Sequence, residues 1–508
     1  MRRALGAAVA CAVALSLTAA CGGDDGTPDG AADGRPNVVF VITDDMTVDD
    51  LEAMPELASW LTDEGTSFER AYVSVSLCCP SRTTMLRGQY AHNTGVHSNE
   101  GTAGGFSVVH DEGLESSTVA TWLRDAGYRT GLVGKYLNRY PQGAGPTYVP
   151  PGWDTWVSPV GSSEAGYDYT LNHDGRLVAY GDAPEDYATT VFVDETIAFA
   201  ARSVEAGDPF FAWLAVDAPH EPGVAAPEDV GTYDDRRAPR SGAFDRVDPS
   251  APDWVRDLPP LSAADREEID DRYRGRSETL RSLDRELARL ADELDGLGVL
   301  DDTYVVLISD NGFHLGQHRL KAGKQSAYEE DVRVPLLVRG PGVPAGATSD
   351  ALVANVDLPP TFAELAGADV PDFVDGRSLA PLFGGDEDAP AADRAAVLLE
   401  HWVPVFTTDG GDVDQDALID AIGVPEAGVR GEGPSPPDYA GLRTRRYTYV
   451  EYVTGEVELY DNEADPDQVR NLAATAPREL LDRLAARLAA LEGCAGASCR
   501  AAEAVPVP

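Results

Sequence analysis

Four continuous apolar runs along the chain each end in polar residues of a chemically reactive type. They are "NVVFVITDD" (37–45), "YRTGLVGK" (128–135), "PFFAWLAVDAPH" (209–220) and "YVVLISDN" (304–311). Uninterrupted runs rich in β-branched and aromatic residues are typical of strands that are buried on both faces of a sheet. We therefore predict four core strands over these residues.

The stretches between these runs show helical periodicity. Residues 119–127 and 262–298 are two examples, and both end on a glycine, as helices often do. Alternating strands and helices predict an α/β fold with a large, mostly parallel sheet flanked by helices. Ligands of such sheets bind outside the carboxyl ends of the strands, so we expect the four polar endings to meet at one edge.

A stretch rich in glycine, proline and acids at 382–394 predicts the end of this large domain, which we place at 36–385. The remaining residues, 386–508, are expected to form a small α+β domain with an antiparallel sheet. Its candidate elements are two strands at 445–452 and 456–461 and a helix at 477–493.

The N-terminus reads as an export signal. Residues 1–20 hold two arginines followed by a small-residue apolar run, and the run ends in two alanines before Cys21. This pattern resembles a bacterial lipoprotein signal, in which the cysteine is lipidated. Thr18 stands where the pattern prefers leucine, so secretion without an anchor stays open. Residues 21–35 are expected to be a flexible tether, and the protein to be extracellular or held at the cell surface through Cys21.

The charge of the chain excludes one class of partner. The formal net charge of the 508 residues is −46, with 40 basic and 86 acidic residues, whereas a nucleic-acid backbone needs a basic surface. An anionic substrate would therefore need a locally positive pocket. Only three of the basic residues are lysines, Lys135, Lys321 and Lys324.

Acidic and amide side chains at two strand ends predict a cation site. Asp44 and Asp45 end the first run, and Asp310 and Asn311 end the fourth. An oxygen-only set suits a hard divalent cation, and we expect calcium in preference to magnesium. The alternative is that the acids only cap the ends of strands and the starts of helices.

The cysteines raise a question that the residues alone leave open. Cys494 and Cys499 are expected to form a local disulfide, because exported proteins meet an oxidising environment. Cys78 and Cys79 are not explained by pairing, because a disulfide between neighbours strains the backbone. Cys78 is the candidate nucleophile beside the acid pairs, yet a soft thiolate is a poor partner for calcium.

The segment "SLCCPSRTTMLRG" (76–88) resembles the first motif of the sulfatase family, C-x-P-S-R. The resemblance implies that a formylglycine-generating enzyme converts Cys78 to formylglycine, which would also face the cation, and that Cys79 fills the variable position. It further implies that one hydroxyl of the hydrated aldehyde attacks the sulfur and that deprotonation of the other releases sulfate. A serine could perform the first step but not the second.

The second sulfatase motif is present as "GYRTGLVGKYL". By resemblance, Lys135, His220 and Lys324 contact the sulfate, and Arg82 steadies the diol. By elimination, His220 is also the best candidate for the leaving-group acid. Many arylsulfatases have a histidine where this chain has Leu137, which leaves that acid open.

The resemblance runs from about Pro36 to the C-terminus and implies an alkaline-phosphatase-like fold. Its closest form is the N-acetylglucosamine-6-sulfatase subgroup, because of the double cysteine, "GKYLN" and "ELYDNEADPDQVRNLA". It implies that the substrate is a sulfated sugar or glycan. His92, His314 and His318 lie in segments where contacts to such a substrate are expected.

Two other functions remain as alternatives. A phosphate or phosphonate ester hydrolase of the same superfamily would use a similar site for another tetrahedral anion. A surface glycan-binding protein with an inactive site belongs to a different class. The presence of Cys78, Arg82 and both motif lysines argues against an inactive site.

Overall fold

The computed structural model describes residues 34–386, 393–406 and 434–506. The predicted signal, Cys21 and nearly all of the predicted tether lie outside the described residues. The strands are β1 (Asn37–Thr43), β2 (Thr66–Tyr72), β3 (Arg129–Gly134), β4 (Thr155–Pro159), β5 (Thr170–His173), β6 (Arg176–Ala179), β7 (Phe210–Ala215), β8 (Thr303–Ser309), β9 (Leu336–Arg339), β10 (Ala347–Ala354), β11 (Ala396–His401), β12 (Tyr439–Thr444), β13 (Tyr447–Tyr452) and β14 (Val457–Asp461).

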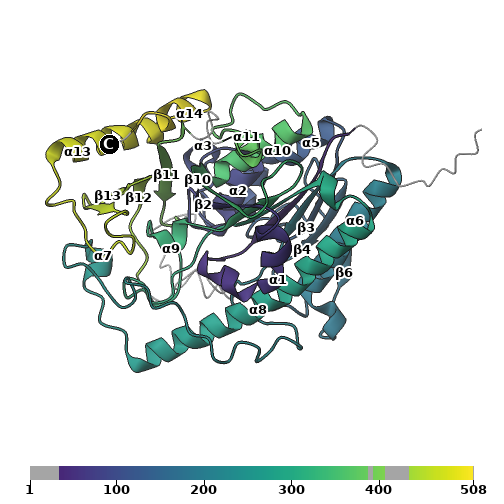
Figure 1. Cartoon of the computed structure of the whole chain (residues 1–508), viewed down its shortest axis with the longest axis horizontal. Coiled ribbons are helices and arrows are strands. Elements are labelled where there is room, and N and C mark those ends of the chain that lie inside the picture. Colours follow the sequence, from purple (N-terminus) through teal and green to yellow (C-terminus); the bar gives the residue numbers. More distant parts are fainter. Residues whose placement is uncertain (1–33, 387–392, 407–433, 507–508) are drawn as a thin grey trace, which may run out of the picture.

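Helices lie on both sides of the larger sheet and beside the smaller one (Figure 1). They are α1 (Pro55–Leu57), α2 (Cys78–Arg87), α3 (Ala91–Thr94), α4 (Gly105–Asp111), α5 (Val119–Asp125), α6 (Ala188–Ala206), α7 (Asp253–Arg256), α8 (Ala263–Gly296), α9 (Glu329–Val332), α10 (Leu358–Ala366), α11 (Ala380–Phe383), α13 (Arg478–Glu492) and α14 (Ala497–Glu503). Within the described part of the chain, no helix has the length and apolar character needed to cross a bilayer.

The central sheet has ten strands in the order β10-β2-β9-β8-β1-β7-β3-β4-β5-β6. The four predicted core strands are β1, β3, β7 and β8, and they are neighbours in the middle of the sheet, where all of them run parallel. Antiparallel strands occur further out, at β9, β5 and β6. The prediction of a large, mostly parallel sheet is confirmed.

Strand β1 shows why its sequence is apolar throughout. Val38, Phe40 and Ile42 belong to the core that α2, α5 and α10 cover. Val39 and Val41 point to the opposite face and join the core under α6 and α8. All five side chains are buried, as expected for a strand that is covered by helices on both faces.

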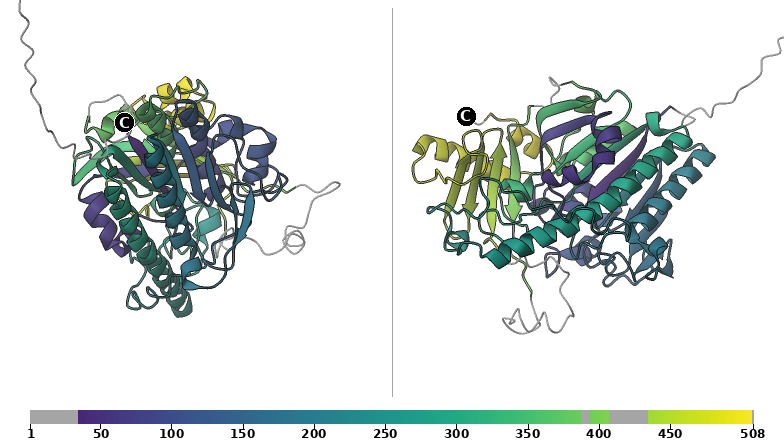
Figure 2. Two further views of the ribbon diagram at one scale, coloured as in Figure 1. Left: turned by 90° about the vertical axis from the view of Figure 1, so that its right-hand side faces the viewer. Right: turned by 60° about the horizontal axis from the view of Figure 1, so that its bottom comes forward.

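The second sheet is antiparallel, with the order β11-β12-β13-β14, and it lies beside the central sheet (Figure 2). The predicted strands at 445–452 and 456–461 are β13 and β14, and the predicted helix is α13. The predicted α+β character is therefore confirmed. The boundary at 385/386 stays a prediction, although it falls between β10 of the central sheet and β11 of the second.

A buried ionic cluster joins the two parts. Arg394 lies just before β11, and its Nη2 atom donates to Asp357 Oδ1 at 2.7 Å and to Glu503 Oε2 at 2.9 Å. Asp357 precedes α10, whereas Glu503 ends α14. All three side chains are fully buried, so the cluster binds the C-terminal helix to the core of the larger part.

Candidate active site

The two acid pairs meet at the carboxyl edge of the central sheet. Asp44 and Asp45 directly follow β1, while Asp310 and Asn311 follow β8, the parallel neighbour of β1. The backbone N–H of Asp45 donates to Asp310 Oδ1 at 3.2 Å. All four side chains are at most 1% exposed. The predicted gathering of polar strand ends at one edge is thus present.

Cys78 is the first residue of α2, where it faces the acid pairs. Its Sγ atom lies 3.5 Å from Asp44 Oδ1, and Lys324 Nζ donates to it at 2.8 Å. Burial, and after it the negative charge of Asp44, raise the pKa of the Cys78 thiol well above its ordinary value. An unmodified thiol in this position stays protonated, and a neutral thiol is a weak nucleophile.

Arg82 lies one helical turn after Cys78 and organises the carboxylates. Its Nε donates to Asp310 Oδ2 at 2.7 Å, and its Nη2 donates to Asp44 Oδ2 at 3.3 Å. Its Nη1 donates to the carbonyl of Lys135 at 2.8 Å. Burial alone would lower the pKa of Arg82, but Asp310 and Asp44 raise it. The guanidinium is therefore a permanent charge that fixes the ends of both strands.

Two lysines supply the local positive charge that an anionic substrate needs. Lys135 Nζ lies 2.7 Å from Asp44 Oδ2 and 3.1 Å from Glu164 Oε1. Lys324 Nζ lies 2.5 Å from Asp45 Oδ1. Burial opposes the charged form of Lys324, yet the negative charge of Asp45 raises its pKa above the ordinary value. Two of the three lysines of this acidic chain thus converge on the site.

His220 also lies at this site, beside the acid pairs. Its Nδ1 atom donates to the carbonyl of Glu221 at 2.7 Å, which leaves Nε2 directed toward Asp45 Oδ2 at 3.8 Å. Burial would lower the pKa of His220, but Asp44 and Asp45 raise it. The imidazole is consequently held by the backbone at one nitrogen and available for proton transfer at the other.

The buried carboxylate oxygens of Asp44 and Asp45 fit a hard divalent cation. Suitable ligand atoms of Asp44, Asp45, Cys78 and His220 lie within 4.8 Å of one another. The Nδ2 atom of Asn311 donates to Asp45 Oδ1 at 2.6 Å, whereas its buried Oδ1 atom has no hydrogen-bond partner. A buried carbonyl oxygen without a partner is costly, and a cation among the carboxylates would satisfy it.

The three histidines predicted to contact the substrate are engaged elsewhere. His314 Nδ1 lies 2.9 Å from Asp331 Oδ1, and His318 stacks on Tyr328 with 3.7 Å between the ring centroids. His92 lies 2.7 Å from a carboxylate oxygen of Glu400 in β11. The role of these three histidines in substrate binding stays a prediction.

The structure adds two acids that belong to neither of the two sulfatase motifs. Glu164 lies in the loop between β4 and β5, and Asp217 follows β7; together with Lys135 they line the same small cavity. Ser163 Oγ donates to Asp217 Oδ2 at 2.5 Å. Burial, opposed in part by Lys135, raises the pKa of Asp217 to about 6. Only the position of Asp217 at a strand end could have indicated it from the sequence.

The other described cysteines and Leu137 lie either in a disulfide bond or in the hydrophobic core. Cys494 and Cys499 are joined by a disulfide bond. Cys79 and Leu137 are buried in the core beside α2, so Leu137 offers no group for proton transfer.

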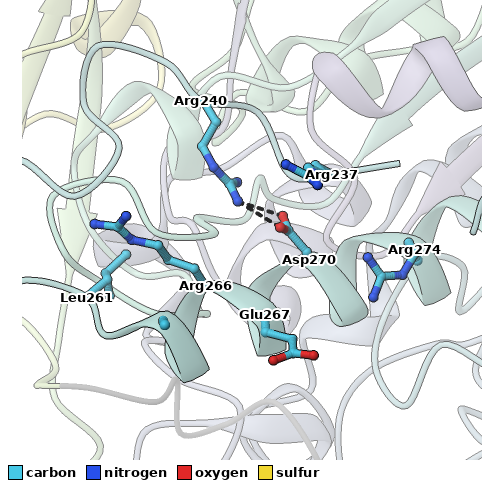
Figure 3. A pocket seen from close by; sticks show the side chains of 8 residues that line it. Arg237, Arg240, Leu261, Arg266, Glu267, Asp270 and Arg274 are labelled. Atoms are coloured by element: carbon cyan, nitrogen blue, oxygen red, sulfur yellow. Dashed lines mark hydrogen bonds and ion pairs between the residues drawn. The ribbon is translucent and has the colours of Figure 1, made fainter. Parts of the chain in front are cut away.

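A second hollow, of about 640 Å³, lies on the outer flank of α8 (Figure 3). It is lined by Arg237, Arg240, Arg266 and Arg274, together with two acids. Three of these arginines already pair with aspartates: Arg240 with Asp270, Arg266 with Asp245, and Arg274 with Asp271. The hollow therefore has little unbalanced positive charge and is no second anion site of comparable quality.

Comparisons with known proteins agree with this geometry. The family model described as Sulfatase matches residues 36–368. The human N-acetylglucosamine-6-sulfatase is 34% identical over 484 residues, which cover 92% of this chain and 86% of the human protein.

Two solved structures share the fold. One, a complex with its substrate D-glucosamine-2-N,6-O-disulfate, has a TM-score of 0.71 at 23% identity and covers 90% of this chain and 97% of its own. The other, a phosphonate monoester hydrolase from Silicibacter pomeroyi, has a TM-score of 0.66 at 25% identity and covers 89% and 93%. The family match, taken with the site at the sheet edge, shows that this chain belongs to the sulfatase family and is a sulfuric ester hydrolase.

Proposed function

We propose that this protein removes a 6-O-sulfate from a glucosamine-type sugar or glycan fragment, with Cys78 converted to formylglycine and calcium as the cation. The observation that carries the proposal is the convergence of Lys324, Asp44 and Arg82 around Cys78, the first residue of the sulfatase motif. The 34% identity to the human N-acetylglucosamine-6-sulfatase supports the choice of sugar.

Conversion of Cys78 to formylglycine removes the mismatch between a soft thiolate and a hard cation. A buried thiol with a raised pKa is a weak nucleophile, whereas the hydrated aldehyde of formylglycine supplies an oxygen nucleophile. Cys78 is the first residue of α2, so the positive end of the helix dipole lies close to the negative charge that develops at this position. Cys79 takes no part, since its side chain is buried in the core.

The charged side chains of the site have different roles in catalysis. Lys135 and Lys324 are placed to bind sulfate oxygens, and each contact to charge that develops in the transition state is worth about 3 kcal/mol. Arg82 holds Asp44 and Asp310 so that they can bind the cation. The cation would polarise the sulfate ester. His220 Nε2 is the proton donor for the sugar oxygen that leaves.

We also infer that the protein is exported. The disulfide between Cys494 and Cys499 fits an oxidising compartment, and the N-terminal sequence fits an export signal. We further propose that a lipid attached to Cys21 anchors the exported protein to the membrane. Labelling with a radioactive fatty acid, compared between the wild type and Cys21→Ala, tests it.

The experiment for the modification is the mass of the tryptic peptide "AYVSVSLCCPSR" (71–82) from protein purified from its native host. We expect the mass loss of an aldehyde at Cys78 and an ordinary cysteine at Cys79. Two ordinary cysteines in protein that nevertheless binds sulfated sugar would favour the non-catalytic binding protein instead.

A phosphonate ester hydrolase is the second candidate, favoured by the likeness to the Silicibacter pomeroyi enzyme. Matched sulfate, phosphate and phosphonate esters of one alcohol separate the two functions. We expect sulfate release to be the fastest. Faster turnover of the phosphonate ester would overturn the proposed substrate.

A further inference from the structure

Glu164 is held at the site although it belongs to neither the nucleophile, the cation ligands nor the family motifs. It lies in the loop between β4 and β5, and its side chain is only 8% exposed. Its Oε1 atom is 3.1 Å from Lys135 Nζ and 3.8 Å from His220 Nδ1. A carboxylate thus borders the place where a sulfate oxygen has to bind.

Lys135 has two carboxylate partners that come from different kinds of structural element. Asp44 directly follows β1, is fully buried and is fixed by Arg82. Glu164 is carried by a surface loop that runs between Gly161 and Gly166. Both glycines have positive φ angles, of 96° and 75°, and Gly161 is exposed. Of the two carboxylates, Asp44 is thus held at a strand end by Arg82, whereas Glu164 reaches Lys135 from a loop.

An anion bound to Lys135 and the carboxylate of Glu164 compete for the same ammonium. The two side chains are largely buried, so their attraction is screened less than that of a surface pair. A bound sulfate oxygen would also lie near the negative charge of Glu164, which would weaken its binding. When sulfate leaves, the ion pair between Glu164 and Lys135 re-forms.

We propose that Glu164 is the internal counter-anion of Lys135, which competes with the sulfate product and thereby speeds its release. Glu164 acts through Lys135 and is a positioning residue rather than a catalytic one. The inference rests on the proposed function, because it assumes that Lys135 binds the sulfate. It explains why a carboxylate is retained beside an anion site, where it would otherwise only oppose substrate binding.

The test uses the holoenzyme with the variants E164Q and E164A and inorganic sulfate as the probe. Calorimetry gives the Kd for sulfate, and steady-state kinetics give KM, kcat and the inhibition constant of sulfate. We expect both variants to bind sulfate about ten-fold more tightly or better and to show a lower KM. Where product release limits turnover, kcat falls at the same time. A purely structural role would not tighten binding.

Glu100 offers a matched control. It pairs with Arg139, which lines the same cavity, and its side chain is 15% exposed. E100Q removes one negative charge from this region, and we expect the Kd for sulfate to stay within two-fold of the wild-type value. Equal tightening in E100Q and E164Q would reduce the effect to net charge and overturn the proposal.

One further outcome of the sulfate-binding experiment would overturn the proposal. An unchanged or weaker affinity for sulfate in folded E164Q and E164A, with folding checked by thermal melting, would overturn competition by Glu164. Failure of the proposed function looks different, because the wild type would then release no sulfate from an ester. The calorimetric comparison with inorganic sulfate would still decide the role of Glu164 in that case.

Discussion

Lys324 Nζ lies 2.8 Å from Cys78 Sγ, so a buried ammonium directly faces the position of the nucleophile. The same ammonium is held by Asp45 at 2.5 Å. This arrangement keeps a positive charge where negative charge develops during attack on a sulfate ester.

Replacing Lys324 by alanine should therefore lower kcat/KM by about 100-fold to 1000-fold. Sulfate release from a chromogenic ester measures the effect. Lys321 provides a control three residues earlier, because it pairs with Asp265 at the surface. Lys321→Ala should stay within about two-fold of the wild type, and an equal loss in both variants would contradict a specific role of Lys324.

Removing the side-chain oxygen of Asn311 should weaken cation binding. Its buried Oδ1 has no partner among the described residues, and its Nδ2 orients Asp45. We expect Asn311→Ala to raise the Kd for calcium about ten-fold or more, measured by competition with a fluorescent chelator.

The matched control for this variant is Asn172→Ala. Asn172 is a buried asparagine of β5 that donates to Tyr140 and lies away from the acid pairs. The Asn172→Ala variant should be less stable than the wild type but should bind calcium with the same affinity. Normal calcium affinity in Asn311→Ala would exclude Asn311 as a ligand.

The cluster around Arg394 should make a large contribution to stability. Arg394→Met leaves the buried carboxylate of Asp357 without its arginine partner, while Glu503 keeps Arg377. Breaking a buried pair in this way costs about 3–5 kcal/mol, and urea unfolding measures it. Arg478→Met is the control, because Arg478 pairs with Asp482 on an exposed helix face and should leave the midpoint nearly unchanged. Similar midpoints for both variants would contradict the prediction.

The stability of the fold should fall as the pH drops below neutrality, in part because of His401. Burial lowers the pKa of this side chain to about 4 in the folded protein, whereas an unfolded histidine titrates near pH 6.5. Its contribution is complete above about pH 6.5 and is lost progressively as the pH falls toward 4, because the unfolded state then binds more protons.

The free energy of unfolding of the wild type and of His401→Asn, compared between pH 7.5 and 5.5, isolates this contribution. The wild type should lose about 1 kcal/mol more than the variant over this range. Parallel profiles would show that His401 can accept a proton without unfolding.

The central part of the fold and the acid pairs could be predicted from the sequence because both follow from local patterns. Apolar runs such as 37–43 identify a strand by themselves, and the residue after each strand is placed by the strand. Cys78, Arg82 and Lys135 lie in short motifs whose spacing is fixed along the chain. For these residues, the position along the sequence largely determines the position in the folded protein.

Glu164 could not be predicted, because its place depends on how the β4–β5 loop packs against Lys135. No periodicity or motif in the loop carries that information. Strand β12 was missed for a related reason: "YAGLRT" contains few β-branched residues, and its place is given by pairing with β11 and β13. Tertiary context outweighs propensity in both cases.

The parallel pairing of β1 with β8 places Thr43 opposite Ser309. Successive side chains of a strand point to opposite faces, so a shift of one residue in either strand would reverse the side chains that follow it. Insertions inside these two strands should therefore abolish cation binding, whereas insertions in the surrounding loops should not. Evolution can thus lengthen or exchange the loops to suit new sugars while the hydrogen-bond ladder preserves the chemistry.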